Sequence, residues 1–382
     1  MIFHVTSLPH TQTTLEYDSC AYTAKARKFC NMMKDLGHTV YLYASEENEA
    51  NVDELITVAT KEEQLKWFGE RQPDDQYVID WDASAEHWAV TNARTVQEIE
   101  KRAGDRDFIC VIAGSCHKPI ADAFPALMTV EYGIGYRGVF SKYKVFESYA
   151  HMHWVYGRNH SDNGQFFDCV IPNYFELENF PFSEEKDDYY LFMGRMIRRK
   201  GPDIAADITR KIGAKLIMAG QGGDPIPGGG VILDRGAKDR MEIHGDHIEL
   251  VGHADVPTRA KLMSRAKALI APTTYLEPFG GVTIEALLCG TPVIATDFGA
   301  FPENIRHGID GYRMRTIGEG VWAAKNVDSL NRVKIAQDAR ARFSTDAIKY
   351  QYEAYFQQLL TLWGEGFNSD WDYGVSTLNR YV

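Results

Sequence analysis

The sequence predicts an α/β fold with two βαβ series, each of which builds a parallel sheet. Residues 2–6, 21–36 and 39–43 form a strand, an amphipathic helix and a second strand by their apolar spacing. Residues 189–193 begin a second series, and residues 268–295 form a strand–loop–helix–strand unit. Strands that alternate with helices in this way indicate parallel sheets.

The most informative stretch lies in that last unit, where Glu277 and Glu285 are separated by seven residues. An apolar run closed by Pro272 predicts a buried strand, and residues 282–289 predict a helix ended by Gly290. The glycine loop between them therefore opens a helix at the carboxyl end of a strand. Open α/β sheets bind ligands there, and helix N-termini favour phosphate.

The two carboxylates suit sugar hydroxyls better than phosphate. Glu285 is expected in the first turn of the helix, near the same end as Glu277. The simpler alternative is that Glu285 only complements the helix dipole and Glu277 is a surface charge.

The stretch resembles the donor-sugar signature of family-four retaining glycosyltransferases of the GT-B fold. The matching residues are Glu277, Pro278, Phe279, Gly280, Gly281, Glu285 and Ala286, followed by residues 289–295. Val282, between them, is also expected to bind the donor. The resemblance implies two Rossmann-like domains facing a cleft, with a C-terminal helix that crosses back to the first domain. The expected units are an acceptor domain (1–172), a nucleotide-sugar domain (173–345), and a helix and tail (346–382).

Further residues of the second domain match the same family. The segment 194–201 offers Gly194, Arg195 and Lys200 to grip a donor diphosphate, because fixed cations stabilise a departing diphosphate without metal. A solvated basic turn is the alternative. The glycine loop after residues 215–219 and the segment 252–256 are expected near the diphosphate and the base; their donor-binding candidates are Gly220, Gly222, Gly252 and His253. Residues 224–246 are expected to be an irregular surface insertion.

In the first domain the resemblance rests only on the order of elements. Loop 7–20 has no glycine where the family often has a pair, so its His10 is an acceptor candidate or part of a solvated turn. His117 follows a strand end, where a family histidine lies beside donor sugar and acceptor; a core histidine is equally expected. The loop at 132–138 offers Tyr132, Tyr136 and Arg137 to an acceptor.

Composition narrows the protein class. The net charge is −12, which disfavours bulk attraction to polyanions, and no apolar run reaches membrane-spanning length. Six cysteines lack a CxxC pair, so we expect reduced thiols and a cytoplasmic or peripheral protein. Asp-Trp-Asp triplets at 80–82 and 370–372 imitate a metal-binding motif, but neither has the expected strand context.

The resemblance implies a retaining, metal-independent transfer of a sugar from a nucleotide sugar, with uridine diphosphate as the commonest carrier and no cofactor. The expected catalytic residues are Glu277, Lys200, Arg195 and His117. The expected acceptor is a glycan, a small molecule or a hydroxymethylpyrimidine in DNA, since residues 131–157 are similar to a phage-type subgroup. The alternatives are a non-hydrolysing nucleotide-sugar epimerase and a silent binding protein.

Overall fold

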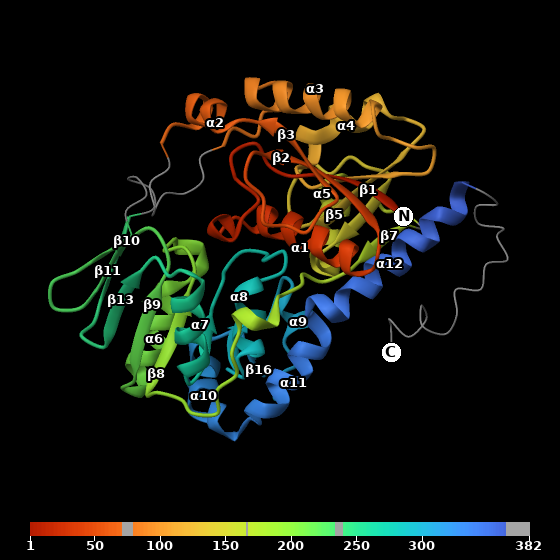
Figure 1. The fold of residues 1–382 in the computed structure, drawn as a ribbon. Coiled ribbons are helices and arrows are strands. Elements are labelled where there is room, and N and C mark those ends of the chain that lie inside the picture. The colour runs from red at the N-terminus through yellow and green to blue at the C-terminus, as the bar shows by residue number, and fades with distance from the viewer. Residues whose placement is uncertain (71–78, 166, 234–239, 364–382) are drawn as a thin grey trace.

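The first of two parallel sheets forms the upper half of the molecule in the computed structural model, which describes residues 1–70, 79–165, 167–233 and 240–363 (Figure 1). Its strand order in these residues is β3-β2-β1-β4-β5-β6-β7. The strands are β1 (Ile2–Thr6), β2 (Thr39–Ser45), β3 (Glu54–Ala59), β4 (Phe108–Val111), β5 (Met128–Ile134), β6 (Tyr143–Phe146) and β7 (Asp168–Val170). The helices are α1 (Ala21–Asp35), α2 (Lys61–Phe68), α3 (Glu86–Glu100), α4 (Lys118–Ala123) and α5 (Tyr149–Arg158).

The second sheet has the order β13-β9-β8-β14-β15-β16 in the described residues. Its strands are β8 (Tyr189–Met193), β9 (Lys215–Ala219), β13 (Ile248–Gly252), β14 (Leu269–Ala271), β15 (Val293–Thr296) and β16 (Gly311–Met314). Its helices are α6 (Pro202–Ile212), α7 (Val256–Arg265), α8 (Gly281–Leu288), α9 (Phe301–Asn304), α10 (Ile317–Asn326) and α11 (Arg332–Phe343). All pairs in both sheets are parallel, as predicted.

The central strands explain why the sheets are parallel and covered by helices. β4, β8 and β15 are buried along their whole length and carry almost only apolar residues. A strand without a polar face must be covered on both sides, and crossover helices supply that cover.

Residues 224–246 were predicted to be an irregular surface insertion, and for the described residues, 224–233 and 240–246, the expected irregularity was wrong. They contribute most of an antiparallel sheet made of β10 (Gly223–Pro225), β11 (Gly230–Leu233) and β12 (Met241–His244). Alternating apolar side chains of β11 are buried, and Gly228 and Gly229 turn the chain with φ of 90° and 106°. The density of glycine and proline concealed a short hairpin.

The C-terminal helix α12 (Thr345–Leu360) leaves the second domain and packs on the first (Figure 1). The ring centroids of Phe356 and Phe3 are 4.7 Å apart, and both side chains belong to the core of the first sheet. The segment that enters the second domain pairs with the segment that leaves it, since the N–H of Phe175 donates to the carbonyl of Phe343 at 2.9 Å. The boundaries at 172 and 345 stay predictions.

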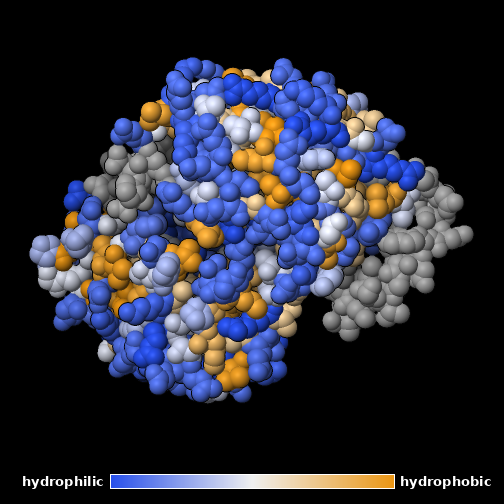
Figure 2. Space-filling model, viewed as in Figure 1, coloured by the Kyte–Doolittle hydropathy of each residue, from blue (hydrophilic) through white to orange (hydrophobic). Residues whose placement is uncertain are grey.

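Polar side chains cover most of the face shown in Figure 2, with small hydrophobic patches between them. Within the described ranges, no helix combines the length and apolar character needed to span a bilayer.

Candidate functional site

The donor loop, residues 277–281, lies between the carboxyl end of β14 and the first turn of α8. Gly280 has φ of 79°, and a Cβ there would lie 2.6 Å from the ring of Phe301, so only glycine fits. Asn304 of α9 donates from Nδ2 to the carbonyl of Phe279 at 2.6 Å, and this hydrogen bond holds the loop against α9. The helix therefore starts at Gly281 with its first N–H groups directed out of the sheet edge.

Lys200 and Glu277 meet at this loop. Lys200 Nζ lies 2.6 Å from Glu277 Oε2, and the ring of Tyr275 lies 5.1 Å from the same ammonium. Burial works to lower the pKa of Lys200, but the charge of Glu277 and the neighbouring Tyr275 outweigh it, so the pKa is raised. Lys200 therefore stays protonated beside the helix N-terminus.

Three predicted glycines lie at the carboxyl ends of the neighbouring strands β8, β9 and β13. A Cβ on Gly220 would overlap the carbonyl oxygen of Gly194, and the N–H of Gly220 donates to the carbonyl of Gly252 at 2.6 Å. Gly222 follows with φ of 89°. This edge is bare backbone, which leaves space for a ligand to approach the sheet.

Arg195 lies directly after this edge and is exposed. Among the described residues it has no ion-pair partner, so its guanidinium is available to an anion. Arg199, four residues further along, is engaged differently, with its guanidinium 4.8 Å from the ring of Tyr275.

Glu285 is the fifth residue of α8, so it lies at the start of the second turn and the predicted first-turn position is wrong. The helix starts at Gly281, one residue earlier than predicted, and carries Glu285 into its second turn. Its carboxylate forms an ion pair of 3.4 Å with Arg259 of α7. Arg259 and His253 line a cavity of about 680 Å³ together with Leu15 and Tyr17 of the first domain. This cavity therefore lies between the two domains.

The structure buries His117 inside the first domain. Its side chain is only 3% exposed, its Nδ1 lies 3.1 Å from Thr6 Oγ1, and Trp88 packs edge-on against it at 5.4 Å. Burial lowers the pKa of His117 to about 3. It is a neutral core residue here, because the strand end that carries it is covered by α3.

The predicted acceptor residues of the segment 132–138 differ in exposure: Tyr132 is buried, Tyr136 is half-buried and Arg137 is exposed. Tyr132 was expected in a loop but lies in β5, fully buried and stacked on Phe29 at 4.3 Å, because the strand continues to Ile134. Tyr136 follows the strand and donates to Glu131 at 3.1 Å. Arg137 is exposed, with its guanidinium 5.6 Å from the ring of Trp154.

The first part of the loop at 7–20 is not a solvated turn, since most of residues 7–14 are buried, whereas residues 15–19 are exposed or half-exposed. Gln12 Nε2 donates to Gln64 of α2 at 2.6 Å, and the N–H of Thr13 donates to the carbonyl of Glu47 at 3.0 Å. His10 packs against Phe68 and Trp81, and burial lowers its pKa to about 3.

Sequence reasoning missed the residues that join the two domains beside the donor loop. Ser148 Oγ donates to the carbonyl of Pro278 at 2.6 Å. The N–H groups of Tyr149 and Ala150, at the start of α5, donate to Glu303 at 2.8 and 2.7 Å. Ser148 was recognisable as a helix cap, but nothing in its pattern pointed to the opposite domain.

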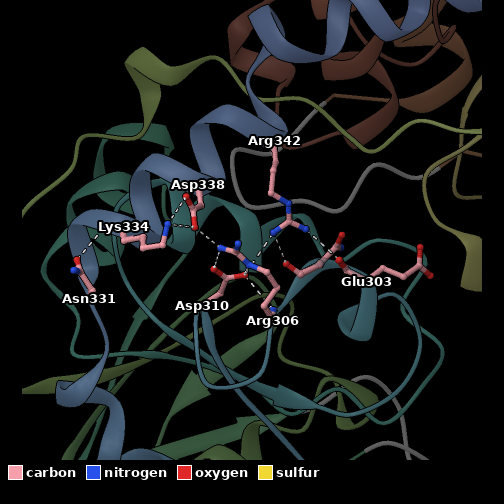
Figure 3. Close-up of polar contacts among 8 residues, drawn as sticks. Glu303, Arg306, Asp310, Asn331, Lys334, Asp338 and Arg342 are labelled. Atoms are coloured by element: carbon pink, nitrogen blue, oxygen red, sulfur yellow. Dashed lines mark hydrogen bonds and ion pairs between the residues drawn. The ribbon is translucent and has the colours of Figure 1, made fainter. Parts of the chain in front are cut away.

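A polar network holds Glu303 in place (Figure 3). Arg342 donates to the carbonyl of Glu303 at 3.2 Å and to Asp310 at 3.5 Å. The guanidinium of Arg306 donates to the carboxylate of Asp310 at 2.5 Å and to that of Asp338 in α11 at 2.7 Å. The segment from α9 to β16 is thereby tied to α11.

Among the described residues, no group of three or more His, Cys, Asp or Glu could hold a metal ion. The triplet at 80–82 forms an exposed turn, and the triplet at 370–372 lies outside the described residues. Independence of metal stays a prediction.

Residues 175–349 match the family model described as glycosyl transferases group 1. The D-inositol 3-phosphate glycosyltransferase of Jonesia denitrificans is 29% identical over 178 residues, or 44% of this chain and 40% of that protein. The enzyme of the same name from Mycobacterium tuberculosis H37Ra is 35% identical over 148 residues, or 37% of this chain and 29% of that protein. The matches thus span less than half the length of these curated relatives.

Solved structures resemble almost the whole chain. AviGT4, a glycosyltransferase involved in avilamycin A biosynthesis, has a TM-score of 0.65 at 17% identity, over 94% of this chain and 98% of that one. Sucrose-phosphate synthase from Thermosynechococcus elongatus has a TM-score of 0.63 at 16% identity, over 94% and 99%. Anabaena HepE, solved with UDP and glucose, has a TM-score of 0.61 at 16% identity, over 93% and 99%.

The chain therefore has the GT-B fold of glycosyltransferases, as predicted. Its second domain, over residues 175–349, carries the group 1 glycosyl transferase sequence pattern.

Proposed function

We propose that this protein transfers a sugar from a nucleotide sugar to an acceptor hydroxyl. The observation that carries the proposal is the Lys200–Glu277 pair, held at 2.6 Å where β14 opens into α8. A protonated lysine, a helix N-terminus and a bare glycine edge suit a diphosphate, and a carboxylate beside them suits sugar hydroxyls.

Lys200, Arg195 and the amides of Gly280 and Gly281 would stabilise the charge that gathers on the departing diphosphate. Glu277 would accept hydrogen bonds from sugar hydroxyls. Glu285, oriented by Arg259, would hold the ribose, and the cavity lined by His253 would take the base. We propose a uridine carrier, in line with the UDP complexes of HepE.

The transfer is proposed to retain the anomeric configuration and to need no metal. The bond from the anomeric carbon to the diphosphate breaks, and the acceptor oxygen bonds to the same face of that carbon. The acceptor proton passes to the leaving phosphate oxygen, so no protein nucleophile is required.

The acceptor is proposed to be a glycan or small molecule, or a hydroxymethylpyrimidine base in DNA. The D-inositol 3-phosphate relatives by their name favour a small hydroxylated ring. We also propose a cytoplasmic location, because the six cysteines are all free thiols.

The test is a melting-temperature panel with nucleotide sugars, followed by donor consumption with and without acceptors. A ligand at a hundred times its dissociation constant stabilises a protein by about 2.7 kcal/mol. Release of diphosphate that depends on an acceptor supports the proposal. Conversion of the donor sugar without an acceptor would indicate the epimerase, and binding without turnover would indicate a silent binding protein.

A further inference from the structure

Three aromatic side chains gather at the carboxyl edge of the first sheet, and we call them the aromatic wall. Tyr22 stands at the start of α1, Trp81 precedes α3, and Tyr136 follows β5. The ring centroids of Tyr22 and Tyr136 are 5.6 Å apart, and those of Tyr22 and Trp81 are 6.3 Å apart. Trp81 is 47% exposed, whereas Tyr22 and Tyr136 are half-buried and pack against the core of the first sheet.

The Asp-Trp-Asp triplet at 80–82 explains how Trp81 is presented. Asp80 accepts from the N–H of Asp82 at 2.9 Å, and Asp82 accepts from the N–H of Ser84 at 2.9 Å. The carbonyl of Asp80 also accepts from Trp88 Nε1 at 2.8 Å. These bonds define a firm turn, so the tryptophan has a fixed place although it is exposed.

A chain of contacts connects the aromatic wall to the donor loop. Lys25 Nζ lies 5.4 Å from the ring of Tyr22 and forms a buried ion pair with Glu147. The next residue, Ser148, donates to the carbonyl of Pro278 at 2.6 Å. The wall therefore belongs to the part of the first domain that is docked beside Glu277.

The charges around Trp81 discriminate between acceptor classes. Asp80 and Asp82 flank the ring of Trp81 and are both exposed. Arg137, an exposed cation, follows Tyr136 at the other end of the wall, and Lys25 near Tyr22 is paired with Glu147. Two carboxylates beside the ring disfavour a phosphate at Trp81. Carboxylates accept hydrogen bonds from hydroxyl groups, and an aromatic face packs against the C–H face of a sugar ring.

We propose that Tyr22, Trp81 and Tyr136 form the acceptor subsite, and that the acceptor is an uncharged carbohydrate stacked on Trp81 rather than DNA. This inference rests on the proposed function, because it assigns the acceptor of the same transfer. Trp81 binds the ring of the acceptor, and the flanking carboxylates bind its hydroxyls.

The test uses saturation-transfer NMR on the full chain with UDP present. The probes are methyl glycosides of glucose, galactose, mannose and N-acetylglucosamine. At least one glycoside should bind, Trp81→Ala should weaken it at least tenfold, and Trp81→Phe should keep it within about threefold. Trp322→Ala is the matched control, since Trp322 is 55% exposed on the second domain; it should leave glycoside binding unchanged.

Different results would refute the acceptor subsite and the proposed sugar transfer. If UDP binds but no glycoside does, or if Trp81→Ala binds glycosides as the wild type does, the acceptor subsite is refuted. Binding of an oligonucleotide with 5-hydroxymethylcytosine that Trp81→Ala weakens would refute the carbohydrate assignment. If UDP, GDP and ADP all fail to bind, the proposed function fails, while loss of glycoside binding in Trp81→Ala still supports the carbohydrate surface.

Discussion

Lys200 Nζ and Glu277 Oε2 lie 2.6 Å apart although their residues are 77 positions apart in the chain. The two side chains come from the turn before α6 and from the loop before α8. They combine a cation for phosphate with a carboxylate for sugar hydroxyls at one point of the sheet edge.

Replacing this lysine should abolish turnover without unfolding the protein. We expect Lys200→Ala to lower kcat by about 100-fold or more, since fixed charges at a developing anion contribute on that scale. Steady-state donor turnover measures this, with melting temperature as a check on folding. Arg198→Ala is the matched control, because Arg198 is an exposed cation two residues away. If Arg198→Ala lowered kcat as much as Lys200→Ala does, the positive charge of the segment as a whole, and not the position of Lys200, would determine the rate.

The contact between Glu303 and the start of α5 should hold the two domains together. Glu303→Ala removes two charge-assisted hydrogen bonds, so we expect a larger radius of gyration by small-angle X-ray scattering and a kcat/KM lowered about fivefold or more. Glu184→Ala, at an exposed position, should match the wild type. A compact Glu303→Ala protein with normal kinetics would show that the contact is incidental.

The buried carboxyl of Glu131 should make stability depend on pH. Burial raises the pKa of Glu131 to about 7, although the N–H groups of Ser141 and Phe140 and the hydroxyl of Tyr136 act in the opposite direction. An acid with a raised folded-state pKa ionises first in the unfolded state. The free energy of unfolding should therefore fall, by up to about 3 kcal/mol, as pH rises from about 4.5 to about 7.

Glu131→Gln should remove this fall, because glutamine keeps an acceptor oxygen and does not titrate. Urea unfolding at several pH values measures the difference between the two proteins. Parallel pH profiles for wild type and Glu131→Gln would show that Glu131 titrates normally.

The C-terminal helix should be required for stability of the first domain. Phe356 is fully buried against Phe3 and Phe108, so Phe356→Ala should cost about 3–5 kcal/mol in urea unfolding. Tyr350→Ala on the same helix, where the side chain is 59% exposed, should change stability by less than about 0.5 kcal/mol. A small effect of Phe356→Ala would mean that α12 docks only weakly.

The sequence predicted those parts of the protein that local pattern determines. Strands β8 and β9 were predicted with their correct bounds, because continuous apolar runs between turn residues admit few other readings. The donor loop was recognisable because its chemistry is contiguous, from Glu277 to Glu285.

Residues that depend on long-range packing were not predictable in this way. His117 follows a buried strand and Tyr132 lies within one, but only the placement of α3 and the length of β5 decide that they are buried. Tyr275, Ser148 and Glu303 act through contacts across the sheet edge or between domains, and no spacing rule encodes such contacts.

The most direct test of the diphosphate site compares nucleoside diphosphates with monophosphates by isothermal titration calorimetry. UDP should bind the wild type at least tenfold more tightly than UMP, because only the diphosphate reaches Lys200 and Arg195, and Lys200→Ala should remove most of that difference. Equal affinities for UDP and UMP, with GDP and ADP no better than their monophosphates, would contradict the assignment of Lys200 and Arg195 to a donor diphosphate.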